Sequence, residues 1–415
     1  MEHGITMHVR LIQGRDKDSL FIDKHHIITD GTSEELFYKE LATLYKGERT
    51  EVNKYHYKDY SHWINNLDLR SEKKWWFDYL AGYQRLEIAT DYRIQKNKPT
   101  VGKTKVIPFK KELLCKIRDF SKENKVSDYV LIFTTISMLL SKMYKSKDFV
   151  VGTVANGRVH EAAENMLGMF VNTLPVRVSV DTDQSARQFL NMMNENILST
   201  LSNQNYQFEN IAKDLDAANE GRNPFFDCMF VYQNTRYQDY FEGLAKKNPY
   251  KTTAAKFSLT FEIEDSGHSM DLFLNYDSSL FKQSTIDRLC KNFFTLLENY
   301  LVSNQETISE LSALSKEDKN LLLNFDTLSK HGNVIKLIEE QVDKTPDNIA
   351  LQFGECSLTY SELDNEINKL ANYLITKRNV KIEQKIPLLL QRSEKMVIAI
   401  LGVLKAGAAY VPISP

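Results

Sequence analysis

Cysteine is scarce in this 415-residue chain, and its four cysteines are far apart with no CxxC pair. That spacing indicates neither a disulfide framework nor a cysteine-based zinc site, so a reducing, cytoplasmic location is the default expectation. Long apolar runs are also lacking. The longest, Met396 to Leu404, is far shorter than the roughly 18 residues that span a bilayer. The first residues form no apolar signal segment, so we expect neither secretion by that route nor insertion in a membrane.

A charge excess of either sign is likewise missing, because 53 basic and 55 acidic residues give a formal net charge of −2. Such a balance implies no field that would attract nucleic acid or an anionic membrane. The length leaves room for two or three domains with a sizeable core. Neither length nor composition indicates an oligomeric state.

The most informative stretch runs from His25 to Gly31 and reads HHIITDG in one-letter code. Residues 7–12 and 19–23 alternate as two short strands would, and an amphipathic helix is predicted to follow the stretch. Thr32 and Glu35 have capping-box spacing, so we expect this helix to open there and to close at Gly47. The stretch would therefore lie where a strand gives way to a turn and a helix, a frame that can aim a side chain.

Histidine is the side chain best suited to moving a proton near neutral pH, since its reference pKa is about 6.5. It can act as base for an attacking amine, hydroxyl or thiol within hydrogen-bond reach. Asp30 would lock the turn by accepting hydrogen bonds or pairing with an arginine, and Gly31 would permit the backbone geometry and a substrate's close approach. His25 and His26 would face opposite ways if the strand continued through them.

Metal binding is the rival interpretation, because two histidines and an aspartate are all potential ligands. Adjacent histidines on a strand diverge, and no nearby cluster offers a third ligand, so we predict no metal site. The simplest alternative is that these are turn residues with no chemical role. Further along, Tyr57, Tyr60 and Trp63 recur every three residues, which favours core packing of a helix over stacking on a ligand.

The rest of the chain alternates strand and helix patterns. Polar residues 91–102 predict a linker between two lobes. The next elements are a strand at 105–109, a helix at 111–124, and an apolar helix capped by Ser127. Further strands are predicted at 149–153 and 168–177, and Pro175 predicts that the latter either ends there or lies at a sheet edge. A buried strand ending at Asn234, a hairpin of 257–264 with 270–276, and a helix at 284–301 follow. Residues 311–323 predict a short helical bridge, and another region starts near Val334.

Several motifs occur in the order found in condensation domains of non-ribosomal peptide synthetases, a family that the chain resembles. His25 to Gly31 matches HHxxxDG at every fixed position, and residues 57–63 resemble YxDYxxW. Residues 151–175 resemble the GR...GMFVNTLP motif, residues 205–209 resemble HQxYPFE, and residues 222–234 resemble RNPLFxxxFxxQN. Two later stretches, 358–363 and 404–412, match LTYxEL and LKAGxAYVP from the beginning of an adenylation domain.

This resemblance implies an α/β (α+β) fold like that of chloramphenicol acetyltransferase, with two lobes and a tunnel between them. His26 would be the catalytic residue of peptide-bond formation, an acyltransferase-type reaction. The amine of an acceptor aminoacyl group attacks a donor thioester, each carried on the phosphopantetheine arm of a carrier protein. His26 would either remove a proton or orient the amine and stabilise the tetrahedral species.

The resemblance also assigns supporting residues. Asp30 would pair with Arg158 of the second lobe, although a loop arginine judged by itself is usually solvated. His25 and Gly31 would support the turn, and Asn234 would border the tunnel. No cofactor would be bound directly.

The resemblance further implies a domain layout. We expect a partial first lobe at 1–95, a second lobe at 96–303, a linker at 304–330 and an N-terminal adenylation fragment at 331–415. The family's earlier motifs do not occur, so the first lobe should be incomplete and leave apolar surface uncovered. The fragment lacks the phosphate loop, so its ATP site should be incomplete.

The chain would then belong to a multimodular synthetase, with upstream donor and downstream acceptor carrier proteins as partners. A stand-alone acyltransferase of the same superfamily and an inactive remnant are the alternatives. The sequence names neither the amino acids joined nor the product.

Overall fold

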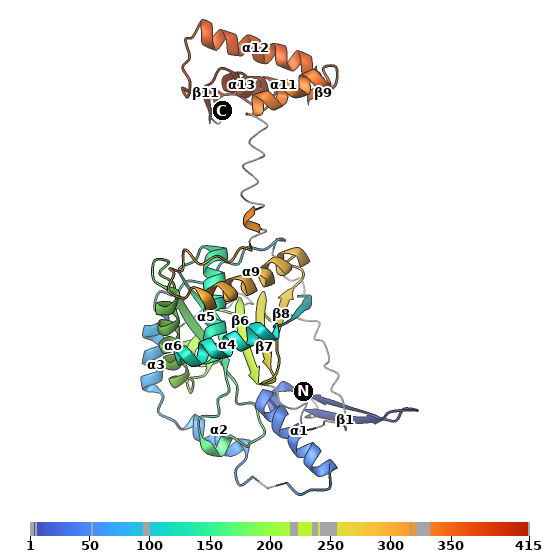
Figure 1. The fold of residues 1–415 in the computed structure, drawn as a ribbon, viewed down its shortest axis with the longest axis vertical. Coiled ribbons are helices and arrows are strands. Elements are labelled where there is room, and N and C mark those ends of the chain that lie inside the picture. The colour runs from blue at the N-terminus through green and yellow to red at the C-terminus, as the bar shows by residue number, and fades with distance from the viewer. Residues whose placement is uncertain are drawn as a thin grey trace. The chain divides into compact units, whose positions relative to one another are not determined.

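A computed structural model describes residues 4, 6–50, 53–93, 100–215, 223–234, 240, 255–315, 318–320 and 333–413. The chain divides into two compact units, residues 1–315 and residues 316–415. Figure 1 shows the elements of each unit. Residues 94–99 of the predicted lobe linker lie outside the described residues, as do 316–317 and 321–323 of the predicted helical bridge and Arg222 of the RNPLF-like motif.

A six-stranded mixed sheet organises the larger unit, in the order β3-β8-β7-β6-β4-β5. Its strands are β3 (Gly102–Pro108), β4 (Asp148–Ala155), β5 (Asn172–Ser179), β6 (Cys228–Asn234), β7 (Leu259–Asp265) and β8 (Met270–Asp277). β6 runs parallel to β4 and β7, and the other pairs are antiparallel. β7 and β8 form the predicted hairpin, and Pro175 lies in an edge strand, as its missing N–H requires.

Four helices share the main core with one face of this sheet (Figure 1). They are α4 (Lys111–Asn124), α5 (Asp128–Tyr144), α6 (Ala186–Ser202) and α9 (Gln283–Val302). α5 is capped by Ser127, as predicted, and is buried almost all round because it contacts α4, α6 and α9. The apolar sequence of α5 thus reflects a central position in this unit.

The opposite sheet face packs against α3 (Arg70–Leu80) and α7 (Phe208–Asp214). β4 serves both layers, since Phe149 and Val151 belong to the main core whereas Val150 belongs to the cluster around Trp76. Its run of apolar residues is therefore explained by burial on two faces rather than one.

The histidine stretch lies among smaller elements near the N-terminus: β1 (Met7–Ile12), β2 (Ser19–Lys24), the 3-10 turn η1 (His26–Ile28), α1 (Gly31–Tyr45) and α2 (Tyr57–Asn65). The two predicted strands are confirmed and pair as a hairpin. The predicted start of the helix is wrong, because Asp30 rather than Thr32 caps α1. Apolar side chains of the hairpin are exposed, Leu11 by 63%.

The second unit contains α11 (Val334–Lys344), β9 (Ile349–Phe353), β10 (Cys356–Thr359), α12 (Tyr360–Thr376), β11 (Lys385–Leu389), α13 (Glu394–Lys405) and β12 (Ala409–Ile413). β9 pairs antiparallel with β10, and β11 pairs parallel with β12. Its core joins Ile335, Leu363, Ile367 and Leu401 from three helices. Thr359 and Glu362 form a capping box at the start of α12, within the LTYxEL-like stretch.

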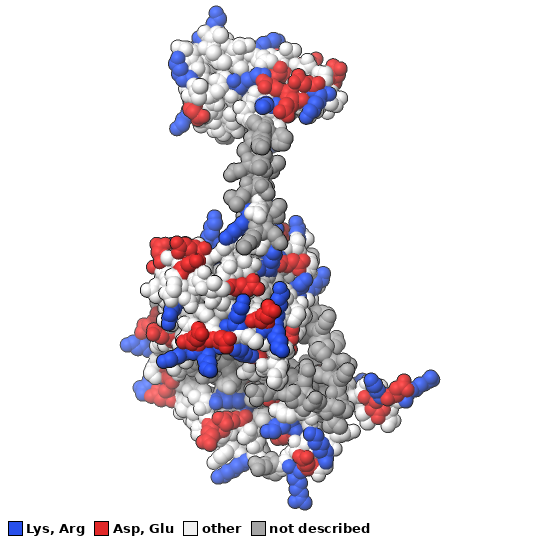
Figure 2. Space-filling model, viewed as in Figure 1, with Lys and Arg blue, Asp and Glu red and all other residues white. Residues whose placement is uncertain are grey.

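Charged side chains of both signs are interspersed over the visible described surface (Figure 2). This agrees with the balance of acidic and basic residues in the sequence. Among the described residues, no single helix is long and apolar enough to cross a membrane, and the pair α4 and α5, bent by 103°, meets that test by length and composition only.

Candidate functional site

The paired histidines lie on a short turn that follows β2. The strand ends at Lys24, so the condition under which His25 and His26 would face opposite ways is not met. His25 instead caps η1: its Nδ1 accepts a hydrogen bond from the Ile27 backbone N–H at 3.1 Å, and its own N–H donates to the Thr6 carbonyl at 2.8 Å. Both histidines are exposed. His25 thus shapes the turn that presents His26.

Asp30 holds the other end of the turn and is only 2% exposed. Its Oδ1 accepts a hydrogen bond from the Ser33 backbone N–H at 2.7 Å, which caps α1. Its Oδ2 accepts from the Phe170 N–H at 2.9 Å. The expected ion pair is also present, with Arg158 Nη2 3.0 Å from Oδ1. One carboxylate therefore joins the start of α1 to the loop between β4 and β5.

Arg158 is buried in that loop, although a loop arginine judged by itself would be solvated. Its Nη1 donates to the carbonyls of Ala163 at 2.5 Å and Met166 at 2.7 Å, and its guanidinium carbon lies 4.0 Å from the centre of the Phe170 ring. These contacts hold the guanidinium in addition to its pairing with Asp30. The pair is thus prearranged from both sides.

Ser33, which the sequence did not single out, also joins the start of α1 to the loop between β4 and β5. It is 1% exposed. Its hydroxyl donates to the Gly168 carbonyl at 2.8 Å and accepts from the Gly168 N–H at 3.0 Å and from Arg158 Nη2 at 2.8 Å. The signal available in the sequence was its position three residues after Asp30, where the helix N3 residue meets its cap.

Two motif glycines differ in what they require. Gly31 begins α1 with φ outside the left-handed region, so its backbone conformation does not require glycine. A Cβ added at Gly31 would have no described heavy atom within 4 Å, which leaves open space beside the histidine turn. Gly157 has φ of +66°, and a Cβ there would lie 1.8 Å from the Phe170 carbonyl oxygen. Of these two glycines, only Gly157 lies where its neighbours and its backbone conformation exclude a larger residue.

The aromatic spacing in α2 serves packing, as predicted. Tyr60 is buried, and its ring lies 4.6 Å from the centre of the Phe170 ring. Tyr57 donates its hydroxyl to the Met169 carbonyl at 2.6 Å. α2 therefore braces the same loop that carries Arg158 and Phe170.

Asn172, within the GMFVNTLP-like stretch, anchors a second loop. Its Nδ2 donates to the carbonyls of Gln204 at 2.7 Å and Tyr206 at 3.3 Å, and its Oδ1 accepts from the Phe208 N–H at 3.2 Å. The GMFVNTLP-like and HQxYPFE-like stretches are thus in direct contact through Asn172.

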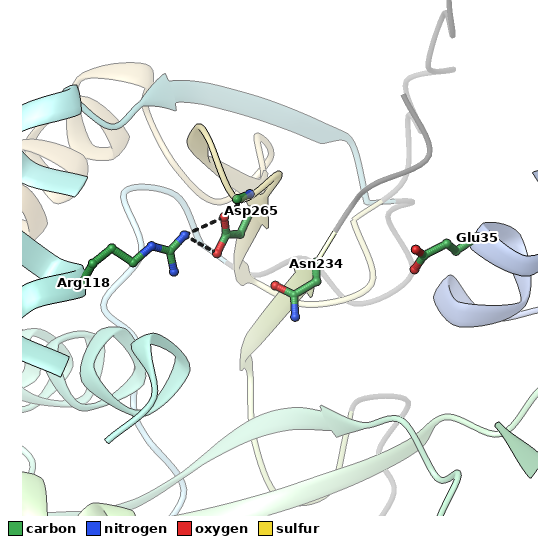
Figure 3. A pocket seen from close by; sticks show the side chains of 5 residues that line it. Glu35, Arg118, Asn234 and Asp265 are labelled. Carbon is green, nitrogen blue, oxygen red and sulfur yellow. Dashed lines mark hydrogen bonds and ion pairs between the residues drawn. The ribbon is translucent and has the colours of Figure 1, made fainter. Parts of the chain in front are cut away.

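A cavity of about 510 Å³ lies between α1 and the ends of β6 and β7, lined by Glu35, Arg118, Asn234, Asp265 and Gly267 (Figure 3). Asn234 lines this cavity between the Arg118–Asp265 pair and Glu35, and its place at the edge of a tunnel stays a prediction. His26 is not among the lining residues. Glu35 accepts a hydrogen bond from the Tyr240 hydroxyl at 3.0 Å.

The charges on the cavity wall are largely compensated. Arg118 Nη2 donates to both Asp265 oxygens, at 2.8 and 2.7 Å, and Nη1 pairs with Asp128. Burial alone would raise the pKa of Asp265, but hydrogen bonds from Arg118, Tyr232 and Gly267 outweigh it and hold that pKa below its usual value. Within the described part of the chain, no three His, Cys, Asp or Glu side chains are grouped to hold a metal ion.

The family model for the condensation domain matches residues 1–323, and that for AMP-binding enzymes matches residues 338–415. The chain belongs to the condensation-domain family. Its relatives include bacitracin synthase 1 of Bacillus licheniformis, 32% identical over all of this chain and 8% of that protein. Gramicidin S synthase 2 of Brevibacillus brevis is 33% identical, over 100% of this chain and 10% of its own length. The chain thus spans about a tenth of these relatives.

Solved structures show the same fold. A four-domain nonribosomal peptide synthetase bound to AMP and glycine gives a TM-score of 0.67 at 21% identity, over 99% of this chain and 33% of that chain. The X-domain from teicoplanin biosynthesis gives a TM-score of 0.62 at 18% sequence identity, over 75% of each chain. The predicted mixed α/β condensation fold is therefore confirmed, with the second unit as the adenylation-type part.

Proposed function

We propose that this condensation-domain chain forms a peptide bond between two carrier-bound substrates. The observation that carries the proposal is the complete HHxxxDG turn, held by the buried Asp30–Arg158 pair in a chain of this family. The acceptor nitrogen attacks the thioester carbonyl carbon, the C–N bond forms, and the C–S bond breaks. The proton lost by the amine ends on the departing thiol.

His26 is the residue proposed to touch the attacking amine, because it is exposed on a turn fixed at both ends. As base it would accept the amine proton, and as an orienting group it would hold the nitrogen toward the carbonyl. His25 and Asp30 position the turn, and the open space at Gly31 gives the substrate room.

Carrier proteins are the proposed partners, delivering the donor and acceptor on phosphopantetheine arms within a larger synthetase. The relatives that support this inference are themselves multimodular synthetases. We assign residues 1–95 and 96–303 to two lobes and 304–330 to the linker. We also infer a cytoplasmic location, with which four free cysteines are compatible.

The test measures dipeptidyl product on the acceptor carrier by mass spectrometry after both carriers are loaded in the module that contains this chain. His26→Ala should abolish product, whereas His268→Ala, an exposed histidine in the β7–β8 turn, should leave the rate unchanged. Near-normal product from His26→Ala would remove the assignment. Product from the wild-type module that appears only with a free amine or alcohol would favour the stand-alone acyltransferase instead.

A further inference from the structure

One carboxylate oxygen touches both flanks of the histidine turn. Lys24, the last residue of β2, places its Nζ 2.6 Å from Glu34 Oε1. Thr29, which follows η1, donates its hydroxyl to the same oxygen at 3.0 Å. Lys24 directly precedes His25, and Thr29 directly precedes Asp30. Glu34 in the first turn of α1 therefore ties together the residues on either side of His25 to Ile28.

Lys24 is unusual for a lysine because its side chain is only 8% exposed. Its Nζ lies 3.8 Å from the centre of the Phe37 ring, on the next turn of α1. A ring face and a carboxylate together compensate an ammonium that has left water. Removing the carboxylate alone would leave a buried, uncompensated charge, which is strongly unfavourable. The position of Lys24 thus depends on Glu34.

The partners of the Glu34 carboxylate differ from those of the Asp30 carboxylate. The Asp30 carboxylate caps α1 at the Ser33 N–H and also binds Phe170 and Arg158, which fixes the helix against the second lobe. It makes no contact with Lys24 or with the Thr29 hydroxyl in the described contacts of those side chains. Asp30 therefore places the helix, whereas Glu34 places the turn on the helix.

From these contacts we propose that Glu34 is a positioning residue for His26, acting through Lys24 and Thr29. The inference rests on the proposed function, in which His26 meets the attacking amine. η1 has only three residues, so a shift at either flank moves the imidazole with it. A misplacement of about 1 Å at a reacting group can reduce a rate by roughly 100-fold. Glu34 itself does not touch the substrate in this proposal.

The closing experiment uses three variants and two measurements. Glu34→Gln keeps an acceptor for Thr29 but leaves the Lys24 ammonium unpaired. Lys24→Met added to Glu34→Gln removes that ammonium, so the pair becomes neutral and fills similar volume. Glu40→Ala, on the same helix, is the matched control. The first measurement is the rate of dipeptide formation in the module that contains this chain, with the KM for the acceptor carrier.

We expect Glu34→Gln to lower kcat by about 10- to 100-fold with KM unchanged, and the double variant to recover to within about threefold of wild type. Glu40→Ala should match wild type. Unchanged kcat in Glu34→Gln, or no recovery in the double variant while it remains folded, would overturn the positioning role.

The second measurement needs no condensation activity. In the 415-residue chain labelled with ¹⁵N-histidine, His25 Nδ1 should show the shift of a nitrogen that accepts a hydrogen bond, because it bonds the Ile27 N–H. Glu34→Gln should move this signal and that of His26, and the double variant should restore both. Unmoved signals would by themselves overturn the positioning role of Glu34. If the wild-type module makes no dipeptide but the signals respond as stated, the proposed function fails while the positioning role of Glu34 stands.

Discussion

Asp30 and Arg158 lie 128 residues apart in sequence, yet their side chains meet at 3.0 Å with almost no exposure to solvent. The carboxylate also caps α1, and the guanidinium also binds two carbonyls of its own loop. Each group is thus also held by contacts outside the pair. The HHxxxDG turn is in this way fastened to the sheet-bearing part of the same unit.

Removing both members of this pair should cost less than the sum of the two single losses. Arg158→Met or Asp30→Asn alone should each lower the free energy of unfolding by about 3–5 kcal/mol, because the remaining group stays buried without its partner. The double variant should lose clearly less than the sum. Urea unfolding followed by tryptophan fluorescence reports on the larger unit, since Trp63, Trp75 and Trp76 all lie in it. Additive losses would mean that the pair is not coupled.

The contacts between the start of α1 and the β4–β5 loop were predictable from the sequence only in part. Asp30 and Arg158 were predicted to pair because motif resemblance carries long-range information that local pattern lacks. Local pattern favoured Thr32 and Glu35 as the helix start. Asp30 is the N-cap instead, because its carboxylate both caps α1 and binds the distant loop. Ser33 escaped notice for the same reason, since its partner Gly168 reaches it only after the chain folds.

Elements buried on a regular face were predictable, whereas turns were not. The alternation in β7 and β8 and the apolar run of α5 determine their structure locally, because burial follows the period of each element. His25 and His26 carry no such pattern. Whether β2 continues through them depends on pairing with β1, which stops at Lys24. The cavity around Asn234 likewise joins residues from four elements that no spacing connects.

His25 gives a prediction that separates turn geometry from chemistry. His25→Ala removes the acceptor for the Ile27 N–H and should slow dipeptide formation about tenfold, because the turn that presents His26 loses its cap. His25→Asn restores an acceptor two residues before that N–H and should stay within about threefold of wild type. Initial rates on loaded carriers test this. Equal losses in both variants would assign the His25 ring a direct chemical part.

Alanine should change the free energy of unfolding at Gly157 but not at Gly31. Gly157→Ala would place a Cβ against the Phe170 carbonyl at a left-handed backbone position and should destabilise the larger unit by about 3 kcal/mol or more. Gly31→Ala meets no described atom and should leave the free energy of unfolding unchanged within about 0.5 kcal/mol. If the open space admits substrate, Gly31→Ala should still raise KM or lower kcat. A fully active Gly31→Ala would show that this space is not used.

Two acids on β7, three residues apart, should give stability effects of opposite sign. Burial, with repulsion from Glu264, raises the pKa of Glu262 despite a hydrogen bond from Asn275. A raised folded-state pKa favours folding below the unfolded pKa, and this advantage is lost as pH rises through the folded pKa. Glu262→Gln should therefore match wild type near pH 4 and exceed it by about 1 kcal/mol at pH 8, the order of one buried hydrogen bond.

The pKa of Asp265 is lowered in the folded state. Its contribution to the free energy of unfolding is therefore complete above the unfolded-state pKa and is lost only as pH falls through the folded-state pKa. Asp265→Asn should lower the free energy of unfolding by about 1–3 kcal/mol, since Arg118 loses a charged partner, and the loss should be constant from pH 5 to pH 8. Urea titrations across that range, extended to pH 4 for Glu262→Gln, compare both variants with wild type. A gain from Glu262→Gln that persisted at pH 4 would have to come from packing, because a protonated glutamate and a glutamine are both neutral there.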